Sequence, residues 1–213
     1  MKKPIPSGIY GITAEEYSRG RNNIEVARMM IRGGVSIIQY REKENKSIRE
    51  KYLECLKIRK MTERANVLFI VNDFLDIACA VDADGVHIGQ NDFPLPVARR
   101  LIGEEKIIGI STHSPEQAKK ALKEGADYIG VGPIFKTSTK KDVVPPVGLE
   151  YLEYVRKNIH LPFVAIGGIK EENIEEVLMR GARLVALVTE IVGADDIIGK
   201  IKRLRKIFRK YNI

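Results

Sequence analysis

The stretch Val67-Leu68-Phe69-Ile70-Val71 is apolar at five consecutive positions. A strand that is apolar on both faces is typical of a buried parallel sheet, because helices cover both faces of such a sheet. Other short β-branched runs recur along the chain, each followed by a polar loop and then by a stretch with helical spacing. The eight runs are Gly8–Thr13, Ser36–Arg41, Val67–Asn72, Asp84–Ile88, Lys106–Ser111, Tyr128–Val131, Phe163–Ile166 and Leu184–Val188.

The runs recur about every 27 residues, which is close to the repeat of the smallest (β/α)8 barrels. The chain of 213 residues has no linker, low-complexity tract or break in composition. The sequence therefore predicts an α/β fold in which residues 1–213 form a single-domain (β/α)8 TIM barrel. A doubly wound open sheet has the same alternation of strands and helices and remains the structural alternative.

Helix boundaries are marked by glycines and charges. Residues 25–32 are expected to form a helix that stops at Gly33-Gly34, since glycine commonly ends a helix. Lys170-Glu171-Glu172 is expected to open a helix that ends at Gly181, because acidic residues favour the first turn.

The composition is that of a globular protein, with 44% hydrophobic and 30% charged residues. No apolar run approaches the roughly 20 residues of a membrane-spanning helix, and no apolar stretch follows Lys2 and Lys3 as a secretory signal requires. Cys55 and Cys79 form no Cys-x-x-Cys motif, which argues against a disulfide scaffold or a cysteine zinc site. We therefore expect a cytoplasmic protein with no membrane partner.

The net charge of +8 suits an anionic partner, such as nucleic acid or a phosphorylated metabolite. Much of it lies near the carboxyl end, at Lys200, Lys202, Arg203, Arg205, Lys206, Arg209 and Lys210. Apolar residues recur there at helical spacing, at Ile197, Ile201, Leu204 and Phe208. The basic residues therefore fill the outer side of an amphipathic helix. No nucleic-acid motif accompanies them, so we interpret that side as solvated and expect no nucleic-acid partner.

In a barrel of this kind the site lies in the loops after the strands. The second run ends in Gln39-Tyr40-Arg41-Glu42-Lys43, and strand alternation directs Tyr40 and Glu42 to the side opposite the other three. A guanidinium beside an ammonium suits phosphate oxygens. A salt-bridge cluster at the strand end explains the segment equally well.

Two carboxylates follow neighbouring strands, Asp73 after the third run and Asp92 after the fourth. Mg²⁺ usually binds one or two carboxylates and completes its coordination with water and substrate phosphate. Asp after a strand is also a common helix cap, but the basic residues nearby favour a magnesium site. His113, after the fifth run, has no identifiable orienting acid, so we leave it outside the catalytic set.

The longest loop follows the sixth run and carries Thr137, Thr139 and Lys140. Long loops in compact domains are usually binding loops or lids. Gly167-Gly168 after the seventh run and Val188-Thr189 after the eighth lie where such barrels frequently bind phosphate. The sequence thus predicts two anion sites at one mouth, an arrangement that suits group transfer between two phosphorylated substrates.

Taken in order, the motifs at these strand ends are specific. They are Tyr10-Gly11-Ile12-Thr13, Gln39-x-Arg41-Glu42-Lys43, Val71-Asn72-Asp73, Ala83-Asp84-Gly85-Val86-His87-x-Gly89-Gln90-x-Asp92, Gly109-x-Ser111-Thr112-His113, Gly125-Ala126-Asp127-Tyr128-Ile129-Gly130-x-Gly132-Pro133-Ile134-Phe135, Thr137-x-Thr139-Lys140 and Ala165-Ile166-Gly167-Gly168-Ile169. Through them the chain resembles the thiamine phosphate synthase (thiamine-phosphate pyrophosphorylase) family over nearly its whole length.

That family joins hydroxymethylpyrimidine diphosphate to hydroxyethylthiazole phosphate, forming thiamine phosphate and releasing pyrophosphate. The resemblance implies a pyrimidine diphosphate site of Gln39, Tyr40, Arg41, Glu42, Lys43, Asn72, Ser111 and Lys140. It implies Mg²⁺ on Asp73 and Asp92, and a thiazole phosphate site of Thr137, Ser138, Thr139, Gly168, Val188 and Thr189. Arg41, Lys43 and Lys140 would be catalytic, because they neutralise the pyrophosphate as it dissociates with the help of Mg²⁺.

One departure from the family pattern lies after the eighth run. The family commonly has Ile/Val-Ser followed by Ala, whereas this chain has Val188-Thr189 followed by Glu190. A carboxylate beside a phosphate site is unfavourable unless it points away or pairs with a cation. The related thiazole tautomerase is the alternative function, but it needs no diphosphate-binding set. A nucleic-acid-binding regulator would leave that set unexplained, and a homo-oligomer is compatible with the sequence.

Overall fold

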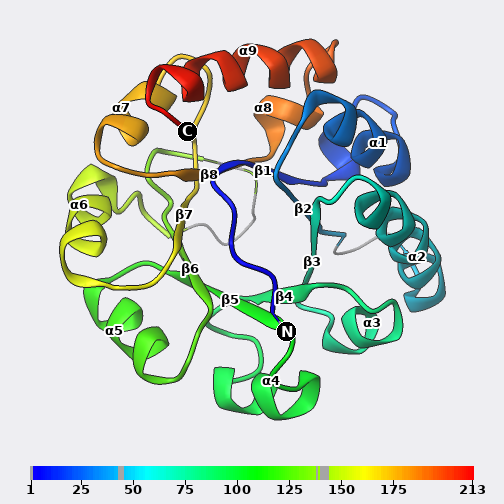
Figure 1. Cartoon of the computed structure of the whole chain (residues 1–213), viewed down its shortest axis with the longest axis horizontal. Helices are drawn as coiled ribbons and strands as arrows, with labels where there is room; N and C mark the ends of the chain where they lie inside the picture. Colours follow the sequence, from blue (N-terminus) through cyan, green and yellow to red (C-terminus); the bar gives the residue numbers. More distant parts are fainter. Residues whose placement is uncertain (1, 43–45, 138, 140–143) are drawn as a thin grey trace.

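The computed structural model describes residues 2–42, 46–137, 139 and 144–213. Eight parallel strands close into a barrel in sequence order (Figure 1). The strands are β1 (Gly8–Ile12), β2 (Ile37–Tyr40), β3 (Leu68–Asn72), β4 (Gly85–Ile88), β5 (Ile107–Thr112), β6 (Tyr128–Val131), β7 (Phe163–Ala165) and β8 (Leu184–Leu187). All eight predicted runs are confirmed as strands. The open-sheet alternative is wrong, because β8 pairs with β1 through Leu184 opposite Gly8.

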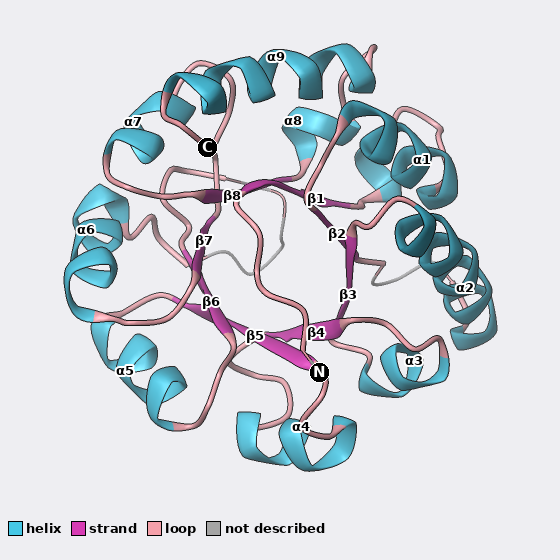
Figure 2. Ribbon diagram, viewed as in Figure 1, coloured by secondary structure: helices cyan, strands magenta, loops and turns pink. Residues whose placement is uncertain are grey.

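Helices surround the barrel as an outer layer (Figure 2). They are η1 (Glu15–Tyr17), α1 (Asn23–Gly33), α2 (Ile48–Arg64), α3 (Leu75–Ala80), α4 (Leu95–Ile102), α5 (Pro115–Lys123), α6 (Gly148–Asn158), α7 (Ile174–Met179), α8 (Thr189–Val192) and α9 (Ile197–Lys210). Within the described ranges, no helix combines the length and the apolar character needed to cross a lipid bilayer.

Strand alternation divides the apolar side chains between two cores. Ile37 lies with Tyr10 and Tyr128 in the cluster inside the barrel. Ile38, the next residue, lies in the larger cluster between the strands and the helices. Both faces of each strand are therefore buried, which explains the unbroken apolar runs of the sequence.

The glycine stop of α1 is confirmed. Gly34 has a left-handed backbone with φ +93° and donates its N–H to the carbonyls of Met30 and Ile31. At the other end of α1, the Asn22 side chain accepts a hydrogen bond from the Glu25 N–H, and the Glu25 carboxylate accepts one from the Asn22 N–H. This reciprocal cap fixes the first turn.

The predicted start of α7 at Lys170 is wrong, because the helix begins at Ile174. The Asn173 side chain accepts a hydrogen bond from the Lys170 N–H at 2.8 Å and donates one to the Gly168 carbonyl at 3.0 Å. An asparagine that satisfies the backbone in this way competes with helix formation. The residues before Ile174 therefore extend the loop that follows β7.

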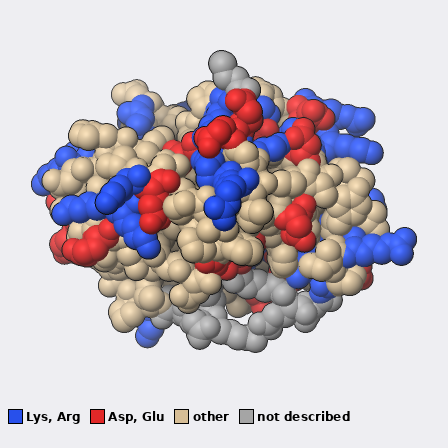
Figure 3. Space-filling model, turned by 90° about the horizontal axis from the view of Figure 1, so that it is seen from below, with Lys and Arg blue, Asp and Glu red and all other residues tan. Residues whose placement is uncertain are grey.

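Ion pairs hold the N-terminal segment across the amino ends of the strands. Asp84 accepts from Lys3 Nζ at 2.9 Å, from Arg59 Nη1 at 3.2 Å and from the Phe69 N–H at 2.8 Å. A second aspartate near this end, Asp127, pairs with Lys2 Nζ at 2.8 Å. Along the side of the barrel seen in Figure 3, acidic and basic side chains are intermixed. The N-terminal segment itself crosses the amino end of the barrel (Figure 1).

Candidate active site

A cavity of about 350 Å³ opens at the carboxyl ends of the strands. This volume lies within the range of small-molecule sites. Every strand, or the residue directly after it, contributes to its walls: Tyr10 and Ile12, Gln39 and Arg41, Asn72, His87, Ser111, Gly130, Val164 and Ile166, and Ala186 and Val188. A ligand there would contact all eight strands at once.

Arg41 supplies a buried cation to this cavity. Arg41 is only 9% exposed, and among the described residues its Nε atom has no hydrogen-bond partner. Within the described part of the chain, no ion pair of its guanidinium occurs. The Thr13 hydroxyl accepts a hydrogen bond from the Arg41 N–H at 2.9 Å, which fixes the backbone at the strand end. A buried cation without a counter-charge is costly, so the guanidinium is suited to a bound anion.

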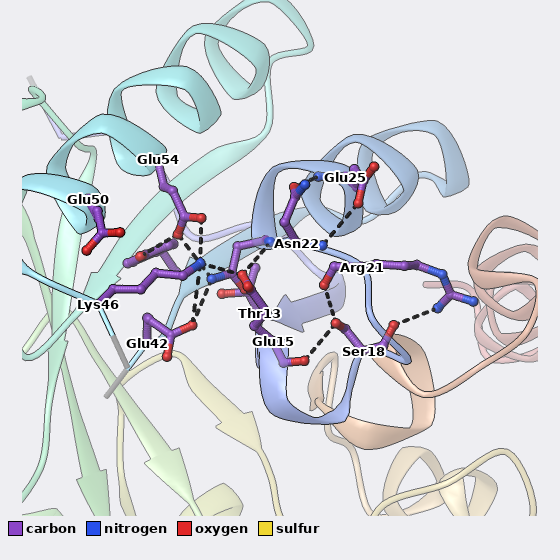
Figure 4. A network of polar contacts seen from close by, with 12 residues as sticks. Thr13, Glu15, Ser18, Arg21, Asn22, Glu25, Glu42, Lys46, Glu50 and Glu54 are labelled. Carbon is purple, nitrogen blue, oxygen red and sulfur yellow. Dashed lines mark hydrogen bonds and ion pairs between the residues drawn. The ribbon is translucent and has the colours of Figure 1, made fainter. Parts of the chain in front are cut away.

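The side chains next to Arg41 point away from the cavity, as strand alternation predicts. Tyr40 donates its hydroxyl to Glu54 at 2.7 Å, and Glu42 accepts from Asn23 Nδ2 at 3.0 Å. Figure 4 shows Glu42 and Glu54 beside Lys46, which contacts Glu15 and Glu54. The Tyr40 and Glu42 side chains thus contact the outer helices and do not line the cavity.

Burial and the neighbouring carboxylates give this outer network a fixed protonation state. Burial, the hydrogen bond to Glu54 and the nearby negative charges raise the pKa of Tyr40, so its phenol stays neutral and donates to Glu54. Burial acts to lower the pKa of Lys46, but hydrogen bonds to Glu15 and Glu54 outweigh it and raise the pKa. The network supports the backbone on both sides of the segment that carries Lys43.

Three of the predicted residues, Lys43, Ser138 and Lys140, lie outside the described residues. Thr137 and Thr139, which flank Ser138, both line the cavity, and their hydroxyl oxygens lie 3.1 Å apart. One of these hydroxyls donates to the other, so the pair leaves one O–H donor for a phosphate oxygen in this region of the wall.

Gly168, Val188 and Thr189 line the neighbouring part of the wall. Gly168 has φ +65°, and a Cβ atom there would lie 2.6 Å from the Lys136 carbonyl oxygen. Only glycine therefore allows the β7 loop to approach the β6 loop so closely. The predicted residues of the second anion site that are described thus come together on one side of the mouth.

Two cations of this wall, Lys136 and Lys170, were missed by sequence reasoning. They follow β6 and β7 and add positive charge beside Thr137 and Gly168. Their position a few residues after a strand was the available signal, but lysines are so frequent in this chain that the signal is weak.

A chain of polar side chains forms the floor of the cavity. Gln39 Nε2 donates to the Tyr10 hydroxyl at 2.8 Å, and the Tyr10 and Tyr128 hydroxyls lie 2.9 Å apart. His87 continues the chain, with Nδ1 2.9 Å from the Tyr128 hydroxyl and Nε2 2.9 Å from Ser111 Oγ. Burial raises the pKa of Tyr10 and of Tyr128, so both phenols stay protonated.

Glycines make room for these rings. A Cβ atom on Gly109 would lie 2.0 Å from Cζ of the Tyr128 ring. A Cβ atom on Gly130 would lie 3.3 Å from His87 Cε1. The polar floor therefore depends on small residues in β5 and β6.

We expect Tyr128→Phe to lower the free energy of unfolding by about 1–3 kcal/mol, because it removes one hydrogen-bond partner from buried Tyr10 and from His87. Urea denaturation measures this change. Tyr154→Phe is the matched control, because the Tyr154 hydroxyl has no hydrogen bond in the described structure, and a change within about 0.5 kcal/mol is expected. Equal effects of the two variants would contradict a structural role for the floor.

Asp73 and Asp92 follow β3 and β4 as predicted, but neither is a helix cap. Phe74 precedes α3 and Pro94 precedes α4 at the cap positions, so the capping alternative is wrong. Asp92 Oδ2 instead accepts from the Gly89 N–H at 2.6 Å, and the Asp73 N–H donates to the His87 carbonyl at 3.0 Å.

The donor set fits Mg²⁺ only if the substrate completes it. The described residues contain no group of three or more His, Cys, Asp or Glu side chains arranged to hold a metal. Two carboxylates on adjacent loops match the sparse protein coordination that Mg²⁺ has in phosphate-binding sites. Asn72 lines the cavity, but neither aspartate does, and Asp92 lines a second, smaller pocket beside Pro94 and Leu95.

His113 and Glu190 are two further residues at this end of the barrel that the sequence analysis singled out. His113 lines the cavity, and its Nδ1 lies 2.5 Å from the Gly132 carbonyl oxygen. That backbone contact orients the ring, in agreement with leaving His113 outside the catalytic set. Glu190 pairs with Lys200 at 2.8 Å, which meets the condition set by the sequence for a carboxylate beside Thr189.

Comparison with known proteins gives concordant matches. The family model described as thiamine monophosphate synthase matches residues 9–191. A thiamine-phosphate synthase of Pelotomaculum thermopropionicum is 64% identical over 206 residues, covering 97% of this chain and 94% of that protein. One of Caldicellulosiruptor bescii is 55% identical, covering 95% and 92%. The solved thiamine phosphate pyrophosphorylase from Pyrococcus furiosus has a TM-score of 0.88 at 38% identity and covers 96% of both chains.

Proposed function

The chain belongs to the thiamine monophosphate synthase family, transferases that release pyrophosphate, and we propose how its barrel mouth performs that reaction. The donor is 4-amino-2-methyl-5-hydroxymethylpyrimidine diphosphate and the acceptor is 4-methyl-5-(2-hydroxyethyl)thiazole phosphate. The products are thiamine phosphate and pyrophosphate. The observation that carries the proposal is a single cavity with two different sides. The buried Arg41 guanidinium, whose Nε has no partner among the residues that the structure describes, lies on one side, and hydroxyls with a glycine loop lie on the other.

The reaction needs no protein nucleophile. The bond between the exocyclic methylene carbon of the pyrimidine and the diphosphate oxygen breaks, and its electron pair leaves with pyrophosphate. The aminopyrimidine ring delocalises the resulting cation. The thiazole nitrogen then attacks the methylene carbon with its lone pair and forms the new C–N bond. Holding both substrates in one cavity makes this attack effectively intramolecular.

Arg41 is the described residue best suited to the leaving group. A forked guanidinium in a buried position stabilises the charge that develops on the departing oxygens. By family resemblance, Lys43 and Lys140 would assist it, with Gln39, Asn72 and Ser111 holding the pyrimidine side. Gln39 and Ser111 are fixed at the two ends of the polar floor, so they could orient a ring without moving.

The acceptor's phosphate suits the opposite side of the cavity. Thr137, Thr139 and Thr189 offer hydroxyls there, and Lys136 and Lys170 offer positive charge. Gly168 lets the backbone approach an anion without a side chain in the way. A phosphate held on this side would point the thiazole ring toward the donor.

Mg²⁺ would be held by Asp73 and Asp92 together with substrate oxygens. When bound, it would supply positive charge that offsets the charge of the diphosphate. The two aspartates lie on consecutive loops of the side that carries Asn72, next to β2 and Arg41. The protein would thus present its cation sites to the donor from adjacent strands.

We expect Asp73→Asn and Asp92→Asn each to raise the Mg²⁺ concentration for half-maximal activity by at least about tenfold. The measurement is initial rate against Mg²⁺ concentration at saturating substrates. Asp76→Asn is the matched control, because Asp76 is an exposed carboxylate in the first turn of α3. Unchanged titration curves for both site variants would refute the magnesium assignment.

The reaction itself is tested by incubating the protein with both substrates and Mg²⁺. Thiamine phosphate and pyrophosphate are expected in equal amounts, and omission of either substrate should abolish both. A protein that isomerises a thiazole phosphate but never releases pyrophosphate would instead be the tautomerase-like alternative. A cytoplasmic location, the absence of a nucleic-acid partner and a homo-oligomeric state stay predictions of the sequence.

A further inference from the structure

A carboxylate lies directly beside the proposed acceptor-phosphate side of the cavity. Thr189 lines the cavity at the first residue of α8, and Glu190 follows it. The Glu190 side chain is only 16% exposed. A mostly buried negative charge at this place would repel a phosphate dianion unless a cation balanced it.

Lys200, in the first turns of α9, supplies that cation. Its Nζ donates to Glu190 Oε1 and to Glu171 Oε2, each at 2.8 Å, and its side chain is 19% exposed. Arg203 Nε lies 3.4 Å from Glu171 Oε1. Two carboxylates and two cations thus form a group with no net charge behind the cavity wall. We call Glu171, Glu190, Lys200 and Arg203 the α9 charge cluster.

The contacts within the cluster shift the pKa values of Lys200 and Glu171 in favour of their charged forms. Burial acts to lower the pKa of Lys200, but hydrogen bonds to Glu171 and Glu190 outweigh it and raise the pKa above the ordinary lysine value. The hydrogen bond from Lys200 holds the pKa of Glu171 below its usual range. Lys200 is therefore charged in the folded protein at neutral pH.

The cluster also joins the two loops that form this side of the cavity. Glu190 Oε1 accepts from the Glu171 N–H at 3.2 Å, which ties the start of α8 to the loop after β7. Lys170, the residue before Glu171, lines the cavity, and so does Gly168. Asn173 fixes the same loop from within. Lys200 thus acts on the cavity through residues that it holds and does not line the cavity itself.

We propose that Lys200 is a positioning residue for the acceptor's phosphate: it cancels the charge of Glu190 behind Thr189 and holds the β7 and β8 loops together around the phosphate. The inference rests on the proposed function, because it assumes that the acceptor's phosphate binds on the Thr189 side. In this proposal, the positive charge that balances Glu190 comes from Lys200 in α9.

The test compares variants that remove the charge of Lys200, of Glu190 or of both. The measured quantity is the affinity for 4-methyl-5-(2-hydroxyethyl)thiazole phosphate in titration calorimetry. Lys200→Met should weaken binding about tenfold, the order expected when one uncompensated carboxylate faces a dianion across partly buried protein. The double variant Glu190→Gln, Lys200→Met should recover binding to within about twofold, because the introduced amide is neutral and its oxygen can still accept from the Glu171 N–H.

The single variant Glu190→Gln keeps the test decisive if Lys200→Met does not fold. It leaves an excess positive charge behind the wall, so we expect the acceptor phosphate to bind a few-fold more tightly. Weaker binding by Glu190→Gln, or no recovery in the double variant, would overturn the electrostatic role.

Two comparisons separate this inference from a general structural effect. Lys210→Met is the matched control, because Lys210 pairs with Glu175 near the other end of α9 and is 65% exposed; its acceptor binding should be unchanged. In steady-state assays, Lys200→Met should raise the KM for the thiazole phosphate and leave the KM for the pyrimidine diphosphate within about twofold.

Use of the unphosphorylated 4-methyl-5-(2-hydroxyethyl)thiazole as acceptor should be unaffected by Lys200→Met, since no dianion is then present. Equal weakening of both acceptors would refute the inference but leave the reaction standing. If the unsubstituted protein forms no thiamine phosphate from the two substrates, the proposed function itself has failed.

Discussion

Replacing Arg41 with methionine is expected to lower kcat/KM for the pyrimidine diphosphate by about 10²- to 10³-fold, the usual cost of removing one donor to a developing oxyanion. The guanidinium is buried in the cavity wall, and its Nε has no hydrogen-bond partner. Methionine has a similar length without the charge, so the wall keeps its shape while the leaving group loses its cation. Steady-state kinetics with the thiazole phosphate at saturation gives the ratio.

The same variant should not be less stable than the unsubstituted protein. A buried charge without a counter-ion destabilises the folded state, so its removal is expected to leave Tm unchanged or to raise it. Arg41→Lys is the informative companion, because an ammonium keeps the charge but cannot bind two oxygens with a planar fork. Near-normal kcat/KM in Arg41→Met would exclude Arg41 from the reaction, whatever its stability.

Asp84→Ala is expected to cause the largest loss of stability, about 3 kcal/mol, because it leaves a buried charge network without its acceptor. The Asp84 side chain is 6% exposed and accepts from Lys3, Arg59 and the Phe69 N–H. For a chain of this size, such a loss corresponds to a fall in Tm of about 6–12 °C. Differential scanning calorimetry measures it.

A surface pair provides the control for Asp84. Asp195 pairs with Arg19 at 2.8 Å, but both side chains are mostly exposed. Asp195→Ala should therefore change the free energy of unfolding by no more than about 0.5 kcal/mol. Since Asp84 lies at the end of the barrel opposite the cavity, folded Asp84→Ala should keep its kcat/KM at low temperature. Equal Tm values for the two variants would contradict the role assigned to the N-terminal ion pairs.

The strands could be predicted because their signal is local and repeated. Each apolar run lies between two cores, so both faces had to be apolar, and every observed strand end lies within about one residue of its run. The start of α7 could not be predicted from its acidic residues alone. A side-chain bond from Asn173 to the backbone decided it, and such a bond depends on the geometry of the loop.

That Arg41, Thr137, Thr139, Gly168 and Thr189 line one cavity could be predicted, because a barrel brings the carboxyl ends of its strands to one mouth. Tyr10 and His87 were missed as residues that line the cavity, since a polar side chain inside an apolar run resembles a satisfied core residue. The available signal was strand alternation: like Gln39, these residues occupy strand positions whose side chains point into the barrel. The pairing of Glu190 with Lys200 could not be foreseen, because the two residues lie ten positions apart on different helices and the turn between α8 and α9 decides whether they meet. The binding, metal and catalytic roles of all the site residues stay predictions, and Lys43, Ser138 and Lys140 lie outside the described residues.

The close contact of Gly109 with the Tyr128 ring has an evolutionary consequence. Since even a methyl group at position 109 would overlap the phenol, position 109 cannot change until position 128 has become smaller. In descendants of this chain, a larger residue at 109 should be found only where 128 has become small. Random mutagenesis at single codons would miss such solutions, whereas a library that varies both codons together would contain them.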